Sequence, residues 1–402
     1  MEPFTHAFTS LAIARAGARR LPRFGTAMLL VSGLAPDLDY ASYFGGAGAF
    51  MQFHRTVLHS VAGSAVVACV VAVAFCLLDR RMPPKRHPTL PVAPLAFGPA
   101  FAVCAIGAAG HVLLDVASGV GVQLLWPFHA HWSAWNLINE LDLWTLLLLV
   151  AGLLLPLLFI LVNEEVGERR KGPGGSRAAV LTLVLLAAYF GARADLHSRA
   201  VDLILSREYH GRIALSAAAF PESSAPFSWR GIAETDNTVE EVDVPLAPRD
   251  AFDPDRSVTL FKPEDSSALS AGEQSPAARK FLMYARFPFA RVQPLEAGYR
   301  VEVRDLRFAD DDNGPANIFV RVDFNSALQI THEGFYFASS PNDQLRGPNS
   351  DSRLFSNVSP PVRWPELTRV ADLLNRGEAD RGGANGLPHT IPIERRPSRG
   401  QS

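Results

Sequence analysis

Residues 141–162 read LDLWTLLLLVAGLLLPLLFILV and contain one ionisable side chain, Asp142. An α-helix of about 20 residues spans the ~30 Å hydrocarbon core of a bilayer, because each residue adds about 1.5 Å. Two shorter apolar segments, 4–18 and 24–35, suit a helical hairpin that enters the membrane only partly. The other long apolar stretches are 57–78, 92–117 and 178–194, the last continuing toward residue 205. The sequence therefore predicts a polytopic α-helical membrane domain over residues 1–205.

Basic residues are distributed unevenly among the loops of this domain. Three loops carry four Lys or Arg each, whereas the two loops between them carry only Arg55. Loops rich in Lys and Arg stay in the cytoplasm, so the other two loops, the N-terminus and everything after residue 205 are expected outside. The basic loops are 15–23, 79–91 and 163–177, and the poor ones are 37–56 and 118–140.

Residues 206–380 have the composition of a water-soluble domain. Alternating apolar and polar residues predict strands, and the turn 296–298 separates the first two of them. A short helix is expected at 367–374, and the tail 381–402 is rich in Gly, Pro and Arg and predicts disorder. The predicted strands are 281–292, 299–308, 317–324 and 327–337. The fold class is therefore mixed: a helical membrane domain followed by an extracytoplasmic, mainly antiparallel β domain.

Composition excludes several classes of protein. The formal net charge of −2 gives no reason to expect a nucleic-acid partner. The three cysteines lie in apolar runs, which argues against a disulfide framework or a cysteine-based zinc module. Glu2 precedes the first arginines, unlike the basic start of a signal peptide, so the N-terminus is expected to be retained. The expected partner is the lipid bilayer, and the oligomeric state is left undefined.

The predicted topology collects histidines and aspartates on the outer side of the membrane. His111 and Asp115 lie in a run of Ala, Gly, Val and Leu, and their i, i+4 spacing puts both on one helix face. An ionisable group inside a span is functional by default. The whole set is His6, Asp37, Asp39, His54, His59, His111, Asp115 and Asp142. Together these residues favour a divalent-metal site, although Asp142 alone also suits the start of a helix.

The ligand types favour zinc, because imidazole and carboxylate groups bind it well, and Mn²⁺ or Fe²⁺ remain alternatives. The set is large enough for one to three ions. A bound ion activates water and holds an anionic oxygen of the substrate. Asp37 or Asp39 is then the expected general base. Arg55 is expected either to neutralise a phosphate or to act as the counter-ion of Asp37.

Two more histidines, His129 and His131, lie in an aromatic outer loop with Trp126 and Trp132. A His-x-His pair suits metal ligation, whereas the tryptophans suit a membrane interface. His197 follows the last apolar segment and is a weaker candidate. The sequence leaves open whether these histidines join the site.

Four short motifs occur in order along the first part of the chain. They are Pro3-Phe4-Thr5-His6-Ala7, Pro36-Asp37-Leu38-Asp39, His54-Arg55-Thr56-Val57-Leu58-His59-Ser60 and Gly110-His111-Val112-Leu113-Leu114-Asp115. In these motifs the chain resembles the YdjM-like family of LexA-regulated, membrane-bound predicted metal-dependent hydrolases of bacteria. The resemblance covers about residues 1–145 and extends weakly to 226–231.

The resemblance implies a helical inner-membrane hydrolase that is similar to zinc-dependent phospholipase C and P1-type nucleases. It implies a phosphoester substrate, such as a lipid headgroup. By this likeness Asp37 or Asp39 would be a ligand or the base. The implied metal ligands are His6, His54, His59, His111 and Asp115.

Two other classes of function use the same residues. A transporter or metal-handling protein would bind the ion transiently, but transporters place such residues near the bilayer midplane between repeats, and no repeat is visible here. A structural envelope protein would carry a vestigial site and bind a partner through its β domain. Substituting His59 or Asp115 by alanine would leave the function of such a protein intact.

Overall fold

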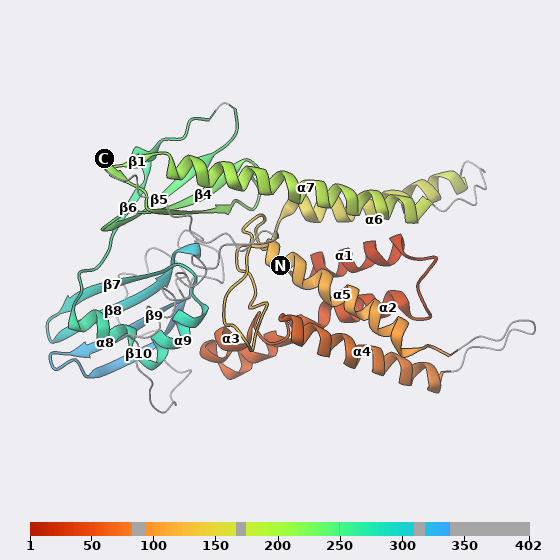
Figure 1. Cartoon of the computed structure of the whole chain (residues 1–402), viewed down its shortest axis with the longest axis horizontal. Coiled ribbons are helices and arrows are strands. Elements are labelled where there is room, and N and C mark those ends of the chain that lie inside the picture. Colours follow the sequence, from red (N-terminus) through yellow and green to blue (C-terminus); the bar gives the residue numbers. More distant parts are fainter. Residues whose placement is uncertain (83–93, 166–173, 249, 309–317, 338–402) are drawn as a thin grey trace, which may run out of the picture.

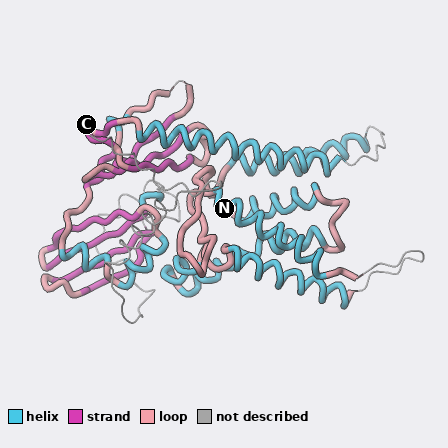
Figure 2. The backbone as a smooth tube through the Cα atoms, in the orientation of Figure 1, coloured by secondary structure: helices cyan, strands magenta, loops and turns pink. Residues whose placement is uncertain are grey.

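The computed structural model describes residues 1–82, 94–165, 174–248, 250–308 and 318–337. Helices of the N-terminal half lie side by side, and the strands gather beyond one end of them (Figures 1 and 2). The predicted mixed fold, helices followed by antiparallel sheets, is therefore confirmed. The helix predicted at 367–374 and the tail 381–402 lie outside the described residues.

The N-terminal half forms helices where the apolar runs predict them. Ser60 ends the loop before α4 by accepting a hydrogen bond from the Gly63 amide, which is the usual role of serine at a helix start. Pro94, predicted within a helix, instead precedes α5. The elements are α1 (Pro3–Ala16), α2 (Gly25–Leu34), the 3₁₀ segment η1 (Ala35–Gly45), α3 (Ala47–Phe53), α4 (Val61–Arg81), α5 (Phe97–Ala117), α6 (Leu143–Glu165) and α7 (Gly174–Leu205).

Three helices of the described chain, α4, α5 and α7, are long and apolar enough to cross a membrane, and α6 contributes a shorter apolar stretch, Leu143–Leu158. The helix α7 has 32 residues and is therefore about 48 Å long, more than the ~30 Å of a bilayer core. Its last turns bury Val201 and Ile204 against Trp229 and Val244 of the β domain. A single helix thus connects the two halves without a hinge.

The described residues of the C-terminal half form two four-stranded antiparallel sheets and one short hairpin. The first sheet has the order β3-β4-β5-β6 and was not predicted, whereas the second has the order β10-β9-β8-β7 and matches the predicted strands. The start of the predicted strand 281–292 is wrong, because residues up to Tyr284 belong to α9. Ser275 caps α9 and Pro276 opens it, two features that favour a helix.

The strands of the hairpin are β1 (Glu208–Tyr209) and β2 (Arg212–Ile213). The first sheet contains β3 (Ser216–Pro221), β4 (Ser228–Glu234), β5 (Thr238–Pro245) and β6 (Val258–Phe261). The second contains β7 (Pro288–Leu295), β8 (Gly298–Asp305), β9 (Ile318–Asn325) and β10 (Ile330–Phe337). The short helices are η2 (Pro254–Arg256), α8 (Ser267–Glu273), α9 (Pro276–Tyr284) and η3 (Leu306–Phe308).

The second sheet also docks on the helical half. Met51 of α3 is buried in one cluster with Phe281 of α9 and Val301 of β8. The loop between α5 and α6 adds polar contacts: Arg286 donates to the Gly119 carbonyl at 2.7 Å, and Arg307 donates to the Val120 carbonyl at 3.0 Å. The β domain therefore holds this loop at the end of the helix bundle.

The helices α1, α2 and α5 cross through small residues. Gly33 of α2 faces Ser10 of α1, and Gly107 of α5 faces Ser32 of α2. A Cβ atom on Gly107 would lie 2.8 Å from the Leu29 carbonyl oxygen, which belongs to the backbone and cannot rotate away. Small residues are what allow membrane helices to approach this closely.

We expect Gly107→Ala to lower the stability of the purified protein, because α2 must move away from α5 to admit the methyl group. Overpacking of this kind costs about 1–3 kcal/mol. The measurement is the thermal unfolding midpoint in detergent. Gly98→Ala is the matched control, because nothing lies within 4 Å of a Cβ on Gly98 in the same helix. Equal midpoints for the two variants would contradict the close crossing.

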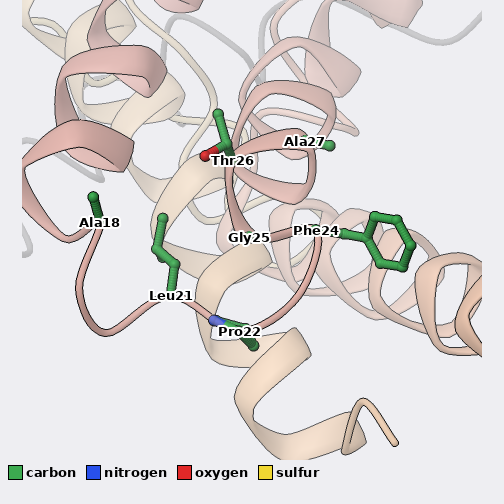
Figure 3. Close-up of a pocket in the computed structure, with 7 residues that line it drawn as sticks. All are labelled: Ala18, Leu21, Pro22, Phe24, Gly25, Thr26 and Ala27. Atoms are coloured by element: carbon green, nitrogen blue, oxygen red, sulfur yellow. The ribbon is translucent and has the colours of Figure 1, made fainter. Parts of the chain in front are cut away.

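A hollow lies at the turn between α1 and α2 (Figure 3), the end of these helices away from His6 and Asp37. Among the described residues, no titratable side chain lines it. Its lining residues are Ala18, Leu21, Pro22, Phe24, Gly25, Thr26 and Ala27. This hollow therefore offers no group for acid–base or metal chemistry.

Candidate metal centre

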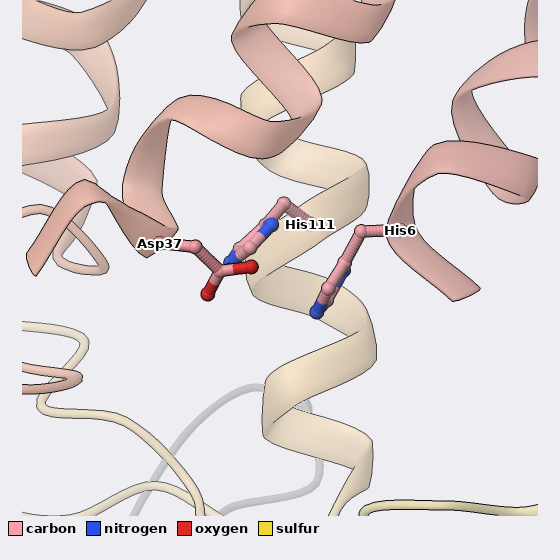
Figure 4. Close-up of side chains that lie close together, drawn as sticks. All are labelled: His6, Asp37 and His111. Atoms are coloured by element: carbon pink, nitrogen blue, oxygen red, sulfur yellow. The ribbon is translucent and has the colours of Figure 1, made fainter. Parts of the chain in front are cut away.

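Four chain segments bring histidines and aspartates together at the end of the helix bundle that faces the sheets. His6 lies in the first turn of α1, and Asp37 lies in η1 directly after α2. His59 precedes α4, and His111 and Asp115 occupy the last turns of α5. Three of these side chains, from three different elements, converge in Figure 4. The helices alternate in direction, and each of these residues lies at or near an end of its element, which is why they meet.

The centre of the cluster is formed by His59, His111 and Asp115, all fully buried. The Nε2 atoms of the two histidines are 3.0 Å apart. Asp115 Oδ2 lies 3.2 Å from His59 Nε2 and 3.1 Å from His111 Nε2. Three atoms that can each donate an electron pair therefore surround one point.

The second nitrogen of each histidine faces an oxygen atom, at hydrogen-bonding geometry only for His111. His111 Nδ1 lies 2.8 Å from the Gly33 carbonyl oxygen, which can only accept, so Nδ1 carries the proton. His59 Nδ1 lies 3.0 Å from Asp39 Oδ2. In neutral rings both Nε2 lone pairs then face the centre. Metal-bound histidines are held in this way, with the far nitrogen donating to a carbonyl or carboxylate oxygen.

Asp37 and His6 lie on the rim of this centre. Asp37 Oδ1 is 3.6 Å from His111 Nε2 and 3.8 Å from His59 Nε2. The His6 ring stacks on His111, with 3.7 Å between ring centroids, and its Nε2 is 3.5 Å from Asp115 Oδ1. Two overlapping groups of possible ligands result, His59/His111/Asp115 and His6/Asp37/His111. Because His111 has one nitrogen left, it can serve only one ion at a time.

The donor set fits a divalent ion. Ligand atoms about 2.0–2.1 Å from a tetrahedral zinc ion are about 3.3 Å from each other, close to the separations found here. Several buried polar atoms have no hydrogen-bond partner among the described residues: both His6 nitrogens, Asp37 Oδ2 and Asp115 Oδ2. Orphaned buried groups are rare and indicate an additional ligand.

The electrostatics of the cluster also favour a cation. Burial lowers the pKa of His59, but Asp115 and Asp39 outweigh burial and raise the pKa above its ordinary value. Burial alone has the opposite effect on a carboxyl group, and it raises the pKa of Asp37. A positive charge at the centre would therefore be stabilised by the surrounding carboxylates.

Asp39 and His54 lie one contact further out. Asp39 Oδ1 is 2.9 Å from His54 Nδ1, and Asp39 Oδ2 accepts a 2.8 Å hydrogen bond from the Arg55 amide. Burial raises the pKa of Asp39, but hydrogen bonds from His54 and His59 bring the pKa below its usual range. Both oxygens of Asp39 are thus committed to holding other residues. His54, which also stacks on Phe50, belongs to neither group of possible ligands among the described residues.

Of the cationic side chains that the structure describes, that of Arg55 lies nearest the cluster. It is buried, with 2% of its surface exposed. Its guanidinium lies 3.6 Å from Asp115 Oδ1, 2.7 Å from Glu140 Oε1 and 3.2 Å from Ser118 Oγ. The amino group of Met1 also contacts Asp115 Oδ1. Asp115 therefore bridges the histidine pair on one side and two cationic groups on the other.

Four candidates from the sequence lie elsewhere. Asp142 caps α6 by accepting from the Thr145 amide at 2.7 Å, and it accepts from the Tyr189 hydroxyl. His197 packs against Trp229 in the β domain. His129 and His131 are exposed, and neither belongs to a group of possible metal ligands in the described part of the chain.

Two participants were not found from the sequence. The Gly33 carbonyl orients His111, and a backbone atom leaves no signature in residue types. Glu140 pairs with Arg55 from the loop in which the sequence analysis singled out only His129, His131 and the tryptophans. Its place directly before the apolar run 141–162 was the one available signal.

Fold and site together define a class: a polytopic membrane protein with a buried His/Asp cluster at one end of its helices and a β domain beyond that end. Residues 1–199 match the family model described as YdjM inner membrane protein, so this half of the chain belongs to the YdjM family. The match reaches further than residue 145, where the resemblance was expected to end, and does not include 226–231. No curated protein and no solved structure shows significant similarity to the chain.

Proposed function

We propose that this protein is a metal-dependent hydrolase of the bacterial cytoplasmic membrane that cleaves a phosphoester, such as a lipid headgroup. The observation that carries the proposal is the convergence of His59 Nε2, His111 Nε2 and Asp115 Oδ2 within 3.0–3.2 Å of one another. Three electron-pair donors at one buried point require a cation or a proton between them.

His59, His111 and Asp115 would hold one divalent ion, with zinc favoured by two imidazoles and a carboxylate. Three protein ligands and an open position are typical of catalytic zinc sites, whereas structural sites are closed by four. Such an ion supplies Lewis-acid activation of the phosphoryl group and of water. His6, stacked on His111, shields the centre on the side of α1.

Asp37 is the proposed general base. Its Oδ2 is buried and has no hydrogen-bond partner among the described residues, and 13% of the whole side chain is exposed. Burial raises its pKa above the ordinary value of a carboxyl group, which makes it a stronger base. Asp39, whose oxygens are both engaged, instead orients His54 and His59. Arg55 would neutralise charge on the phosphoryl group.

The reaction would occur at the outer face of the membrane. The Lys- and Arg-rich loops favour the cytoplasm for the opposite ends of the helices. Figure 1 shows the sheets beyond the end of the bundle at which α1 begins, and His6 lies in the first turn of α1. The β domain would therefore be extracytoplasmic and cover the site.

We expect the purified full-length protein to hydrolyse bis(4-nitrophenyl) phosphate in the presence of Zn²⁺ or Mn²⁺ and to lose this activity with a chelator. Asp37→Asn should lower kcat by about 10²–10⁴-fold, the usual contribution of a general base, while keeping its metal. The release of 4-nitrophenol and the metal content of the same samples are measured together. Metal bound stoichiometrically without hydrolysis of any phosphoester would refute the hydrolase and favour a metal-handling protein.

A further inference from the structure

The guanidinium of Arg55 has a hydrogen-bond donor that no described residue of the cluster uses. It is buried, its Nε has no hydrogen-bond partner among the described residues, and its remaining nitrogens meet Ser118, Asp115 and Glu140. Arg55 also adopts a positive φ of 59°, a conformation that is uncommon outside glycine. Two hydrogen bonds hold the backbone in this conformation. The Arg55 backbone N–H donates to the Asp39 carboxylate, and the Gln123 backbone N–H donates to the Arg55 carbonyl.

Glu140 is the exposed member of the pair with Arg55. Its side chain is 46% exposed, against 2% for Arg55. The Glu140 side chain is therefore the part of this pair that solvent reaches. The same guanidinium nitrogen of Arg55 lies near both Glu140 Oε1 and Asp115 Oδ1, so the Glu140 carboxylate is next to the proposed ion site.

The loop that carries Glu140 is fixed by the β domain. Arg286 donates to Asn136 Oδ1 at 3.1 Å, and Asn139 donates to the Pro221 carbonyl at 3.3 Å. The Glu140 carbonyl accepts from the Glu2 amide. The backbone at Glu140 is thus anchored, and only its side chain is free to swing away from Arg55.

We propose that Arg55 is the anion-binding group of this site and that Glu140 fills its anion position until a singly charged phosphodiester displaces the carboxylate. This inference rests on the proposed hydrolase and names the class of phosphoester that it would accept. A planar guanidinium binds carboxylate and phosphate oxygens with the same fork of N–H donors, which makes the exchange chemically matched.

Charge selects the diester over the monoester. Exchange of one carboxylate for one singly charged anion leaves the total charge of the site unchanged. A doubly charged phosphomonoester would add a negative charge beside Asp37, Asp39 and Asp115. Because the surroundings are buried and weakly screened, this added repulsion is large. Glu140 thus acts as a specificity-determining residue.

The test is the dissociation constant of dimethyl phosphate, a soluble diester, measured by titration calorimetry on full-length protein in maltoside micelles. The wild-type protein should bind dimethyl phosphate more tightly than methyl phosphate at pH 8. Glu140→Gln, which removes the competing charge, should bind dimethyl phosphate about 3- to 10-fold more tightly. Arg55→Lys, which keeps the charge but loses the fork, should bind it at least about 10-fold more weakly. A second experiment replaces dimethyl phosphate by phosphatidylglycerol in the same micelles. If Glu140→Gln increases the affinity for phosphatidylglycerol more than the affinity for dimethyl phosphate, a lipid is the source of the diester.

Glu208→Gln is the matched control, because Glu208 is an exposed glutamate of the β domain, and its affinity should equal that of the wild type. Unchanged or weaker binding of dimethyl phosphate by Glu140→Gln would overturn the inference, as would equal binding by Arg55→Lys and the wild type. Metal content is determined on every sample. If the proteins contain metal but Glu140→Gln does not bind dimethyl phosphate more tightly, only the role of Glu140 and Arg55 is refuted. If the wild-type protein contains no metal, the proposed function itself is refuted.

Discussion

Asp115→Asn protein, purified without chelators, is expected to lose its bound metal, and the His111→Ala/Asp115→Ala double variant is expected to contain none. Among the described residues, Asp115 Oδ2 is the one carboxylate oxygen within 3.2 Å of both histidine Nε2 atoms. Protein zinc sites bind with about 10–16 kcal/mol shared among three or four ligands, so loss of one ligand should weaken binding at least about a hundredfold. Elemental mass spectrometry of the purified proteins gives the ratio of metal to protein. Asparagine preserves the shape of the side chain, so the fold is expected to survive.

Asp142→Asn is the matched control, because Asp142 is also a buried carboxylate at this end of the helices, and in the described structure its side chain accepts hydrogen bonds from Thr145 and Tyr189. Its metal content should equal that of the wild type. The metal content of Asp39→Asn should lie between those of Asp115→Asn and Asp142→Asn, because Asp39 orients His59 without joining the cluster. The affinity for the metal should fall about 10–100-fold. Retention of metal by Asp115→Asn, or its loss from Asp142→Asn, would place the ion elsewhere.

The sequence predicted which side chains of the membrane half would meet, and the physical reason is the alternation of helices. A residue at the start of one helix and a residue at the end of the next lie at the same height. His6, Asp37, His59 and the His111–Asp115 pair all satisfy this rule. The alternation of helices predicts at which end of the bundle a residue lies, but not which hydrogen bonds its side chain makes. It therefore could not distinguish Asp37 from Asp39. Asp37 Oδ2 lacks a hydrogen-bond partner in the described structure, whereas both oxygens of Asp39 have partners. The alternation also could not find the Arg55–Glu140 pair, because two loops far apart in sequence form it.

Strands of the β domain were predicted only where apolar and polar residues alternate along the sequence. In the second sheet, β9 alternates buried and half-buried positions from Val320 to Asn325, and in β8 Val301 and Val303 alternate with charged residues along the sequence. In the first sheet β3 is buried at every position, between α7 on one side and Phe287 and Leu306 on the other. A strand buried on both faces loses the period of two, and the Ala-rich run Ser216–Pro221 has little β propensity. The contact with α7 that makes it a strand is tertiary and cannot be read locally.

Arg307→Ala is expected to destabilise the β domain by about 3–5 kcal/mol, which is the usual cost of removing one partner from a buried ion pair. Arg307 donates to Asp305 Oδ2 through two nitrogens, at 2.9 and 2.7 Å, and both side chains are almost completely buried. Asp305 would remain as a buried charge with only backbone donors, from Arg286 at 2.9 Å and from residue 307 itself. Urea unfolding in maltoside micelles, followed by tryptophan fluorescence, measures the change in free energy.

The same substitution should loosen the loop that carries Glu140, because Arg307 also donates to the Val120 carbonyl across the two halves of the chain. Amide hydrogen exchange in residues 118–140 should therefore become faster, while exchange in α4 and α5 stays slow. Arg256→Ala is the control: its ion pair with Asp253 is exposed, and its loss should cost less than about 1 kcal/mol and leave the loop unchanged. If Arg307→Ala unfolds at lower urea but exchange in the loop does not change, the β domain is stabilised by the pair without holding Glu140 in place. Faster exchange in the loop would instead mean that the β domain sets how firmly the Glu140 carboxylate stays on Arg55.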